Sequence, residues 1–105
     1  MTNELTGGIR LSLQAETDLE DIWHFGAVEW SPARADQYID ALVAVFDLLR
    51  TMPGIARERP EFTPPVRIHP TGPHLVIYRV EDDYLHIVRV LGGRQDWQKL
   101  LDAIE

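Results

Sequence analysis

The stretch that most constrains the fold runs from residue 74 to residue 97. It contains two β-rich runs, at 74–80 and 84–91, separated by three consecutive acidic residues. β-Branched and aromatic side chains fit a pleated, half-buried surface, and a short polar spacer joins two such runs into a hairpin. Both runs are almost continuously apolar, which is typical of central strands. The sequence therefore predicts a β-hairpin at the centre of a sheet.

Two helices are predicted before the hairpin. Apolar residues recur at helical spacing over residues 13–30 and again over residues 32–51. Ser31 and Pro32 mark the second start, because serine caps a helix N-terminus and proline suits the first helical position. So short a joint predicts a helical hairpin, and its apolar stripes should lie on the sheet.

The other segments complete the predicted order β-α-α-β-β-β-α. We expect a short strand at 9–13, a surface loop at 53–65, a strand at 66–69 ended by Pro70, and a closing helix at 96–104 capped by Asp96. The fold class is therefore α+β, with a helical hairpin packed on a small, mostly antiparallel sheet. With 105 residues the chain forms one domain, residues 1–105.

Composition excludes several classes of function. The chain has no cysteine, so disulfides, thiolate catalysis and Cys-ligated metals are excluded. The histidines at 69, 74 and 86 lack metal-binding spacing, and neither a metal nor a cofactor is predicted. No apolar run approaches the roughly 20 residues of a membrane span, and the N-terminus does not resemble a secretory signal. A cytoplasmic protein without membrane contact is predicted.

The net charge of −7 weighs against a protein that coats nucleic acid, so no direct nucleic-acid binding is predicted. The acidic residues are concentrated in the first half: residues 1–50 hold nine acids against three basic residues, and residues 51–105 hold eight against seven. The acidic N-terminal half of the chain is either a solvated helical surface or a surface that binds a basic partner.

Several short segments, taken in order, resemble one family. They are Leu-Glu-Asp-Ile-Trp at 19–23, Tyr-Ile-Asp-Ala-Leu at 38–42, the loop with Arg57 and Arg59, and the runs 74–80, 87–91 and 93–97. Together they resemble the ParE branch of the RelE/ParE toxins of bacterial type II toxin–antitoxin systems, over roughly residues 9–97. The resemblance implies a small α+β toxin that a ParD-like antitoxin holds inactive in a hetero-oligomer. It also implies action on DNA gyrase, by trapping the cleaved-DNA complex.

Two alternatives stay open. RelE-type relatives cleave mRNA in the ribosome, using lysines, arginines and a tyrosine near the C-terminus. Here Lys99 is the only lysine and no tyrosine follows Tyr84, so no catalytic residue is assigned and a non-enzymatic toxin is favoured. The third reading is an attenuated toxin that only binds its antitoxin. Family members often carry His-Gly-Arg-Arg-Asp where this chain has Gly92 and Gln95 in place of the histidine and the second arginine.

Arginines and large aromatic residues are the candidate interface residues, since both types anchor protein interfaces. For the target and toxicity the candidates are Arg67, Arg79, Arg89, Arg94 and Trp97; for the antitoxin they are Trp30, Arg57, Arg59 and Phe62. Arg79 and Arg89 each follow an isoleucine by two positions, so each shares the face of its isoleucine. If that face meets the helices, the arginines pair with helix carboxylates; if it is open, they form a positive groove.

Overall fold

The computed structural model describes residues 4–102. In chain order the elements are β1 (Ile9–Leu11), α1 (Leu13–Glu29), α2 (Pro32–Thr51), the 3-10 turn η1 (Pro53–Ile55), β2 (Glu58–Arg59), β3 (Val66–Thr71), β4 (His74–Glu81), β5 (Tyr84–Gly92) and α3 (Trp97–Asp102). The predicted helical hairpin and the predicted β-hairpin are both confirmed. The sequence-based order lacked one element, the two-residue strand β2.

The sheet has the strand order β1-β5-β4-β3-β2. Strand β1 runs parallel to β5, and the other neighbouring strands are antiparallel, so the prediction of a mostly antiparallel sheet is confirmed. The central hairpin β4–β5 turns at Asp82, whose φ of 46° is a left-handed conformation that aspartate tolerates better than most residues.

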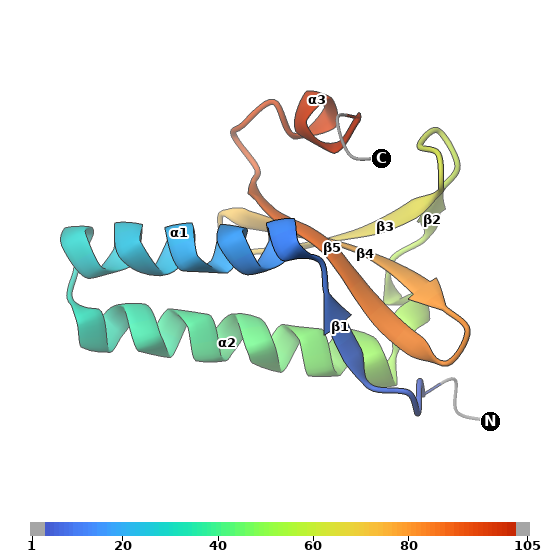
Figure 1. The fold of residues 1–105 in the computed structure, drawn as a ribbon, viewed down its shortest axis with the longest axis horizontal. Coiled ribbons are helices and arrows are strands. Elements are labelled where there is room, and N and C mark those ends of the chain that lie inside the picture. Colours follow the sequence, from blue (N-terminus) through green and yellow to red (C-terminus); the bar gives the residue numbers. More distant parts are fainter. Residues whose placement is uncertain (1–3, 103–105) are drawn as a thin grey trace.

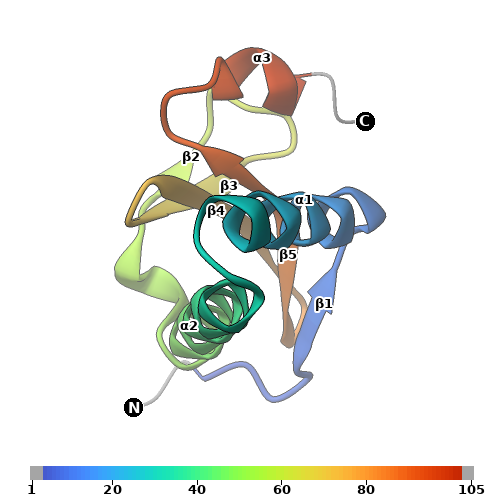
Figure 2. The same cartoon turned by 90° about the vertical axis from the view of Figure 1, so that its left-hand side faces the viewer.

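Each face of the sheet has its own apolar cluster. Helices α1 and α2 cover one face and α3 lies over the other (Figures 1 and 2). The helix-side core joins sheet residues Val76, Tyr78, Leu85, Ile87 and Val90 to Leu42, Phe46 and Leu49 of α2. The outer cluster joins Val66, Ile77, Val88 and Leu91 to Leu101 of α3. Both faces of the central strands are therefore buried, as their continuous apolar character predicts.

A β-bulge interrupts the central hairpin. Tyr78 pairs with Ile87 but Ile77 pairs with Arg89, so Val88 is the extra residue on β5. The simple alternation of side chains fails here, because Ile87 and Val90 both enter the helix-side core. Arg89, two positions after Ile87, nevertheless contacts α1 on the side of Ile87, as predicted for a face that meets the helices.

The first strand is shorter than the predicted strand 9–13, and helix α1 begins at Leu13, as predicted. Strand β1 ends at Leu11, and Ser12 is the N-cap of α1, where its side-chain oxygen accepts a hydrogen bond from the backbone N–H of Ala15. The cap satisfies an N–H group that has no partner within the helix, so the helix begins at Leu13.

Several other boundaries also differ from prediction; α1, β4 and β5 each end within one residue of the predicted position. Strand β3 continues through Pro70 to Thr71, where β2 no longer pairs with it and an edge position tolerates proline. The segment 53–65 is not only loop, because it contains η1 and β2; the Pro53 carbonyl accepts the hydroxyl of Tyr78 at 2.8 Å. Helix α3 begins at Trp97 rather than 96, and the predicted helical residues 103 and 104 lie outside the described residues.

Candidate functional site

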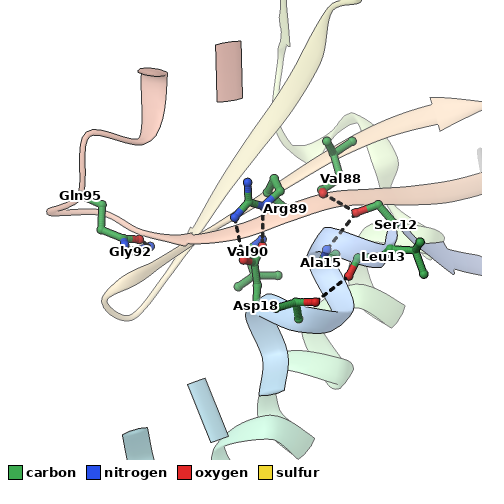
Figure 3. Close-up of polar contacts among 10 residues, drawn as sticks. Ser12, Leu13, Ala15, Asp18, Val88, Arg89, Val90, Gly92 and Gln95 are labelled. Carbon is green, nitrogen blue, oxygen red and sulfur yellow. Dashed lines mark hydrogen bonds and ion pairs between the residues drawn. The ribbon is translucent and has the colours of Figure 1, made fainter. Parts of the chain in front are cut away.

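The best-defined polar contact joins α1 to the bulge of β5 (Figure 3). The Nε and Nη2 of Arg89 donate to the two carboxylate oxygens of Asp18 at 2.7 and 2.8 Å. The backbone N–H of Val90 donates to the same carboxylate at 3.0 Å. Asp18 is only 9% exposed, so its charge depends on these three donors. The hydrogen bonds that Arg89 donates to Asp18 raise the pKa of Arg89, against the opposing effect of burial.

Ser12, six residues before Asp18, fastens the same junction at the start of α1. Its backbone N–H donates to the Ile87 carbonyl at 3.0 Å, and its hydroxyl donates to the Val88 carbonyl at 2.7 Å. The hydroxyl thus satisfies the backbone of the bulged residue while its oxygen caps α1. We call Ser12, Asp18 and Arg89 the clamp, because together they fix the start of α1 on β5.

A groove runs along α1 beside the clamp. Two cavities of about 260 and 530 Å³ share Asp18, Asp21 and Arg89. The smaller cavity extends toward Leu13, and the larger one is lined by Ile22, Phe25, Leu91, Gln95 and Leu100 among others. Three α1 side chains are largely exposed on this helix: Leu13 (82%), Phe25 (64%) and Val28 (82%). We call this feature the α1 groove; Asp18 and Arg89 of the clamp line both of its cavities, and it lies between α1 and the 92–100 segment.

The turn after β5 is closed by Gln95. The Gly92 N–H donates to the side-chain oxygen of Gln95 at 2.7 Å, and the Gln95 N–H donates to the Gly92 carbonyl at 3.1 Å. A Cβ at Gly92 would lie 3.1 Å from that side-chain oxygen, so a larger residue would crowd it. The two positions that depart from the resembled motif therefore contact one another. Arg94 between them is exposed.

Arg79 lies in a different environment from Arg89. Its Nη2 is 3.2 Å from His86 Nδ1 and its Nε is 3.2 Å from Glu81. Strand β1 brings Arg10 opposite His86, and the Arg10 guanidinium lies 4.0 Å above the Tyr84 ring. Burial, and then the charge of Arg79, lower the pKa of His86, which therefore favours its neutral form.

The remaining predicted residues do not form one surface. Arg67 donates to the Ala56 carbonyl at 2.6 Å. The ring of Trp97, a residue predicted to bind the target, lies 6.1 Å from the ring of Phe62, and the Arg59 guanidinium lies 6.0 Å above it. Phe62 and Arg59 were both predicted to bind the antitoxin. Arg57 is exposed in the same segment as Arg59. Trp30 lies in the α1–α2 joint, at the opposite end of the molecule from β2 (Figure 1).

Trp30 is held beside a second polar contact. It is 51% exposed, its ring meets Tyr38 at 6.3 Å, and Arg34 lies 5.3 Å above it. The Tyr38 hydroxyl is 2.6 Å from His74 Nδ1 and ties α2 to the start of β4. Burial raises the pKa of Tyr38 and lowers the pKa of His74. This contact supports a neutral His74 that accepts the tyrosine hydroxyl.

Asp18 and the α1 groove were missed in the sequence. No role was assigned to Asp18 from the sequence, in which it is one of several acids of the predicted helix 13–30. Its spacing from Ala15, Ile22 and Gly26 places it on the buried stripe. A carboxylate within such a stripe requires a cation, because buried charges are paired. That signal would have pointed to an arginine of the sheet.

The described chain offers little for a metal or a membrane. Among residues 4–102, no three His, Asp or Glu side chains gather closely enough to hold a metal ion. In the same range, no helix has both the length and the apolar character needed to cross a bilayer.

Comparison with known proteins now adds the family. The family model described as "ParE toxin of type II toxin-antitoxin system, parDE" matches residues 9–97. The chain belongs to the ParE toxin family. Toxin ParE1 of Caulobacter vibrioides is 33% identical over 82 residues, which cover 78% of this chain and 84% of that protein. Toxin ParE1 of Mycobacterium tuberculosis is 34% identical over 87 residues, which cover 82% and 89%.

The fold comparison agrees. A solved structure described as "Chromosomal ParDE TA system from P. aeruginosa" superposes with a TM-score of 0.70 at 22% identity and covers 81% of this chain and 94% of that chain. The predicted RelE/ParE fold is confirmed, and the chain is a ParE toxin of a type II toxin–antitoxin system.

Proposed function

We propose that this ParE toxin is held inactive by a ParD-like antitoxin and, when free, binds DNA gyrase without catalysing a reaction. The observation that carries the proposal is the open α1 groove in a chain that belongs to the ParE family. Large exposed apolar side chains beside such a groove are typical of a protein interaction site. The neighbouring structure described as a ParDE system supports an antitoxin as the partner.

The placement of the arginines supports binding rather than catalysis. Arg89 is paired with Asp18 and Arg67 is bound to a backbone carbonyl, while Arg94 stands exposed on the turn after β5. RNA cleavage needs a base, an acid and cations that converge on one phosphate. Of the predicted target residues, Arg94 is the cation best placed to reach a partner, and we retain it as the main candidate for toxicity.

A ribonuclease remains the second candidate because of one polar patch. Arg79 lies 3.2 Å from His86 and 3.2 Å from Glu81, and His86 lies 3.8 Å from Glu81. His86 favours the neutral form, which could accept a proton. Both Arg79 and His86 are only partly exposed, and Glu81 already offsets the charge of Arg79. The patch therefore fits an internal ion-pair network better than a substrate site.

The proposal is tested by controlled expression in a bacterium. Expression of the toxin alone is expected to stop growth, and co-expression with the protein of the adjacent gene is expected to restore it. A tagged toxin should then co-purify with that protein at a fixed ratio. Extracts taken at arrest are compared for mRNA cleavage in ribosomes, which the ribonuclease alternative requires. Growth without arrest would instead favour the attenuated toxin.

A further inference from the structure

We propose that the outer face of the sheet, at the end nearer the β4–β5 turn, carries a binding site for a small phosphate-bearing molecule, formed by Arg10, His86 and Arg79. We call these three residues the basic row. The site lies on the face opposite α1 and α2, apart from the α1 groove, and it binds its ligand without transforming it.

The basic row crosses three neighbouring strands. In the sheet register, His86 of β5 lies between Arg10 of β1 and Arg79 of β4. The residues that flank Arg10 and His86 along their strands all belong to the helix-side core or pack against it: Ile9, Leu11, Leu85 and Ile87. Because side chains alternate along a strand, the row points to the opposite face. Neighbouring strands are about 4.8 Å apart, so the row spans roughly 10 Å.

Helix α3 leaves this part of the outer face open. It packs on the outer cluster, whose β5 members Val88 and Leu91 follow His86 along the strand. The β4–β5 turn lies at the far end of the hairpin from α3 (Figures 1 and 2). Arg10 is exposed, and the side chains of His86 and Arg79 are each 23% exposed. The basic row is therefore partly enclosed and still reached from solvent.

The three side chains offer hydrogen-bond donors to a ligand. The Nη2 of Arg79 lies 3.2 Å from Nδ1 of His86, and a guanidinium can only donate, so the neutral imidazole carries its proton on Nε2. Within residues 4–102, no hydrogen-bond partner is found for Nε2 of His86, for Nη1 of Arg79 or for the guanidinium of Arg10. A ligand with several acceptor oxygens would satisfy all three groups.

The charge of the basic row is only partly offset within the fold. Glu81 lies 3.2 Å from Nε of Arg79, yet that buried Nε–H has no hydrogen-bond acceptor in the described part of the chain. Arg10 makes no ion pair within residues 4–102; its guanidinium lies 4.0 Å above the Tyr84 ring, which holds it over β5. Because like charges on neighbouring strands are destabilising, a bound anion would relieve the repulsion between the two arginines.

The donors favour a phosphate group over other anions. Arginine binds phosphate through parallel N–H bonds, and the two outer arginines with a histidine N–H between them match an anion that has oxygens on several sides. A carboxylate has only two oxygens, so it would leave part of the row unsatisfied. A nucleic-acid backbone fits less well, because the net charge of −7 repels a long polyanion. The ligand class is therefore inorganic phosphate or a small phosphate monoester.

The test adds inorganic phosphate to the full chain at constant ionic strength, with chloride as the reference salt. Binding is followed by the NMR signals of the histidine ring protons, and His86→Gln assigns the signal of His86. That signal is expected to shift and to saturate with a dissociation constant on the order of 1 mM. His24 of α1 and His69 of β3 lie outside the row, and their signals should not follow the phosphate concentration.

Two matched variants locate the site. Arg10 and Arg34 are both exposed arginines that lie over an aromatic ring and make no ion pair within residues 4–102. Arg10→Gln is expected to weaken phosphate binding about tenfold, as for the loss of a charge-assisted hydrogen bond. Arg34→Gln removes the same charge from α2 and is expected to change the dissociation constant less than about twofold.

Equal weakening by the two variants would overturn the site, because the attraction would then be unspecific. A His86 signal that shifts equally with chloride would overturn it as well. A second probe, a single-stranded DNA of about 12 nucleotides, separates the two sources of phosphate. If this DNA binds more tightly than inorganic phosphate and loses its binding with Arg10→Gln, the row is a nucleic-acid surface and the small phosphate ligand is wrong. Weaker binding of the DNA, unaffected by Arg10→Gln, is the expected result.

Discussion

Arg79 and Arg89 occupy equivalent places in the sequence but different places in the structure. Each follows an isoleucine by two positions on one strand of the central hairpin. Arg89 makes a two-pronged ion pair with Asp18 of α1, with side-chain exposures of 16% and 10%. Arg79 shares the face of Ile77 in the outer cluster and lies beside Glu81 and His86.

The bulge at Val88 explains the difference. Without the extra residue, side chains would alternate strictly between the two faces along β5. Arg89, which is opposite Ile77, would then lie on the outer face together with Arg79. With it, Arg89 meets α1 while Arg79 remains on the face away from α1 and α2. A single inserted residue thus lets Arg89 link the sheet to the helical layer through its ion pair with Asp18. The other arginine, Arg79, stays in a partly exposed ion pair with Glu81, which is expected to contribute less to stability.

Removing Arg89 should give the largest effect. Arg89→Ala leaves the Asp18 carboxylate nearly buried with only one donor, and loss of one partner from such a pair costs about 3 kcal/mol of unfolding free energy. Arg79→Ala is expected to cost about 1 kcal/mol or less, because Glu81 remains 38% exposed to water. Urea denaturation of both variants measures the difference. Equal losses would contradict the contrast drawn between the two arginines.

The two capping serines sharpen the same contrast. Ser31 caps α2 with a single bond from the Arg34 N–H at 3.1 Å, so Ser31→Ala should cost about 1 kcal/mol. Ser12→Ala removes a cap and also the bond to the Val88 carbonyl, so about 2 kcal/mol is expected. Thermal unfolding of both variants, measured in parallel, ranks the two losses of stability. If Ser31→Ala proves the more damaging, Ser12 does not secure the bulge.

Part of the pH dependence of stability should arise beside Arg79, at His86. The pKa of His86 is lowered in the folded chain, whereas in the unfolded chain it titrates near its ordinary value of about 6.5. The unfolded chain then binds more protons as pH falls below about 7, so the free energy of unfolding decreases between about pH 7.5 and pH 5.5. His86→Gln should flatten this decrease, and Arg79→Ala should flatten it partly by removing the neighbouring charge. His74, whose pKa is also lowered, accounts for the slope that remains.

Arg94 should give the smallest change in stability. It is exposed on the turn that Gln95 closes, so Arg94→Ala is expected to alter unfolding free energy by less than about 0.5 kcal/mol. Growth arrest, in contrast, should be lost if Arg94 contacts the target. A folded Arg94→Ala variant with full toxicity would remove Arg94 from the candidate residues and leave Trp97 and Arg79 to be tested.

The sequence predicted most of the fold because its signals were local. Ser31 and Pro32 marked a helix start, and the runs 74–80 and 84–91 marked the hairpin. What it missed depends on long-range contact. The bond from Ser12 to Val88 spans 76 positions and the pair of Asp18 with Arg89 spans 71, and no local pattern contains both partners. The short strand β2 exists only because β3 pairs with it.

The candidate site residues were likewise predicted only in part from the sequence. Sequence reasoning identified arginines and aromatic residues as interface types, and it left open whether Arg79 and Arg89 were structural. The clamp answers this for Arg89, whose guanidinium is bound within the fold. Trp30 and Phe62, both predicted to bind the antitoxin, lie far apart, in the α1–α2 joint and in the 53–65 segment (Figure 1), and their role in antitoxin binding stays a prediction. A groove made by α1 and the 92–100 segment becomes visible only when both are placed in space.

The most direct test of the account combines purified toxin with DNA gyrase, supercoiled plasmid and ATP, and measures linear DNA after treatment with detergent and protease. The account predicts that linear plasmid accumulates with the toxin, fails to accumulate when the adjacent gene's protein is added first, and falls with Arg94→Ala. A parallel reaction holds translating ribosomes. Intact plasmid together with cleaved mRNA would contradict the account and establish the ribonuclease instead.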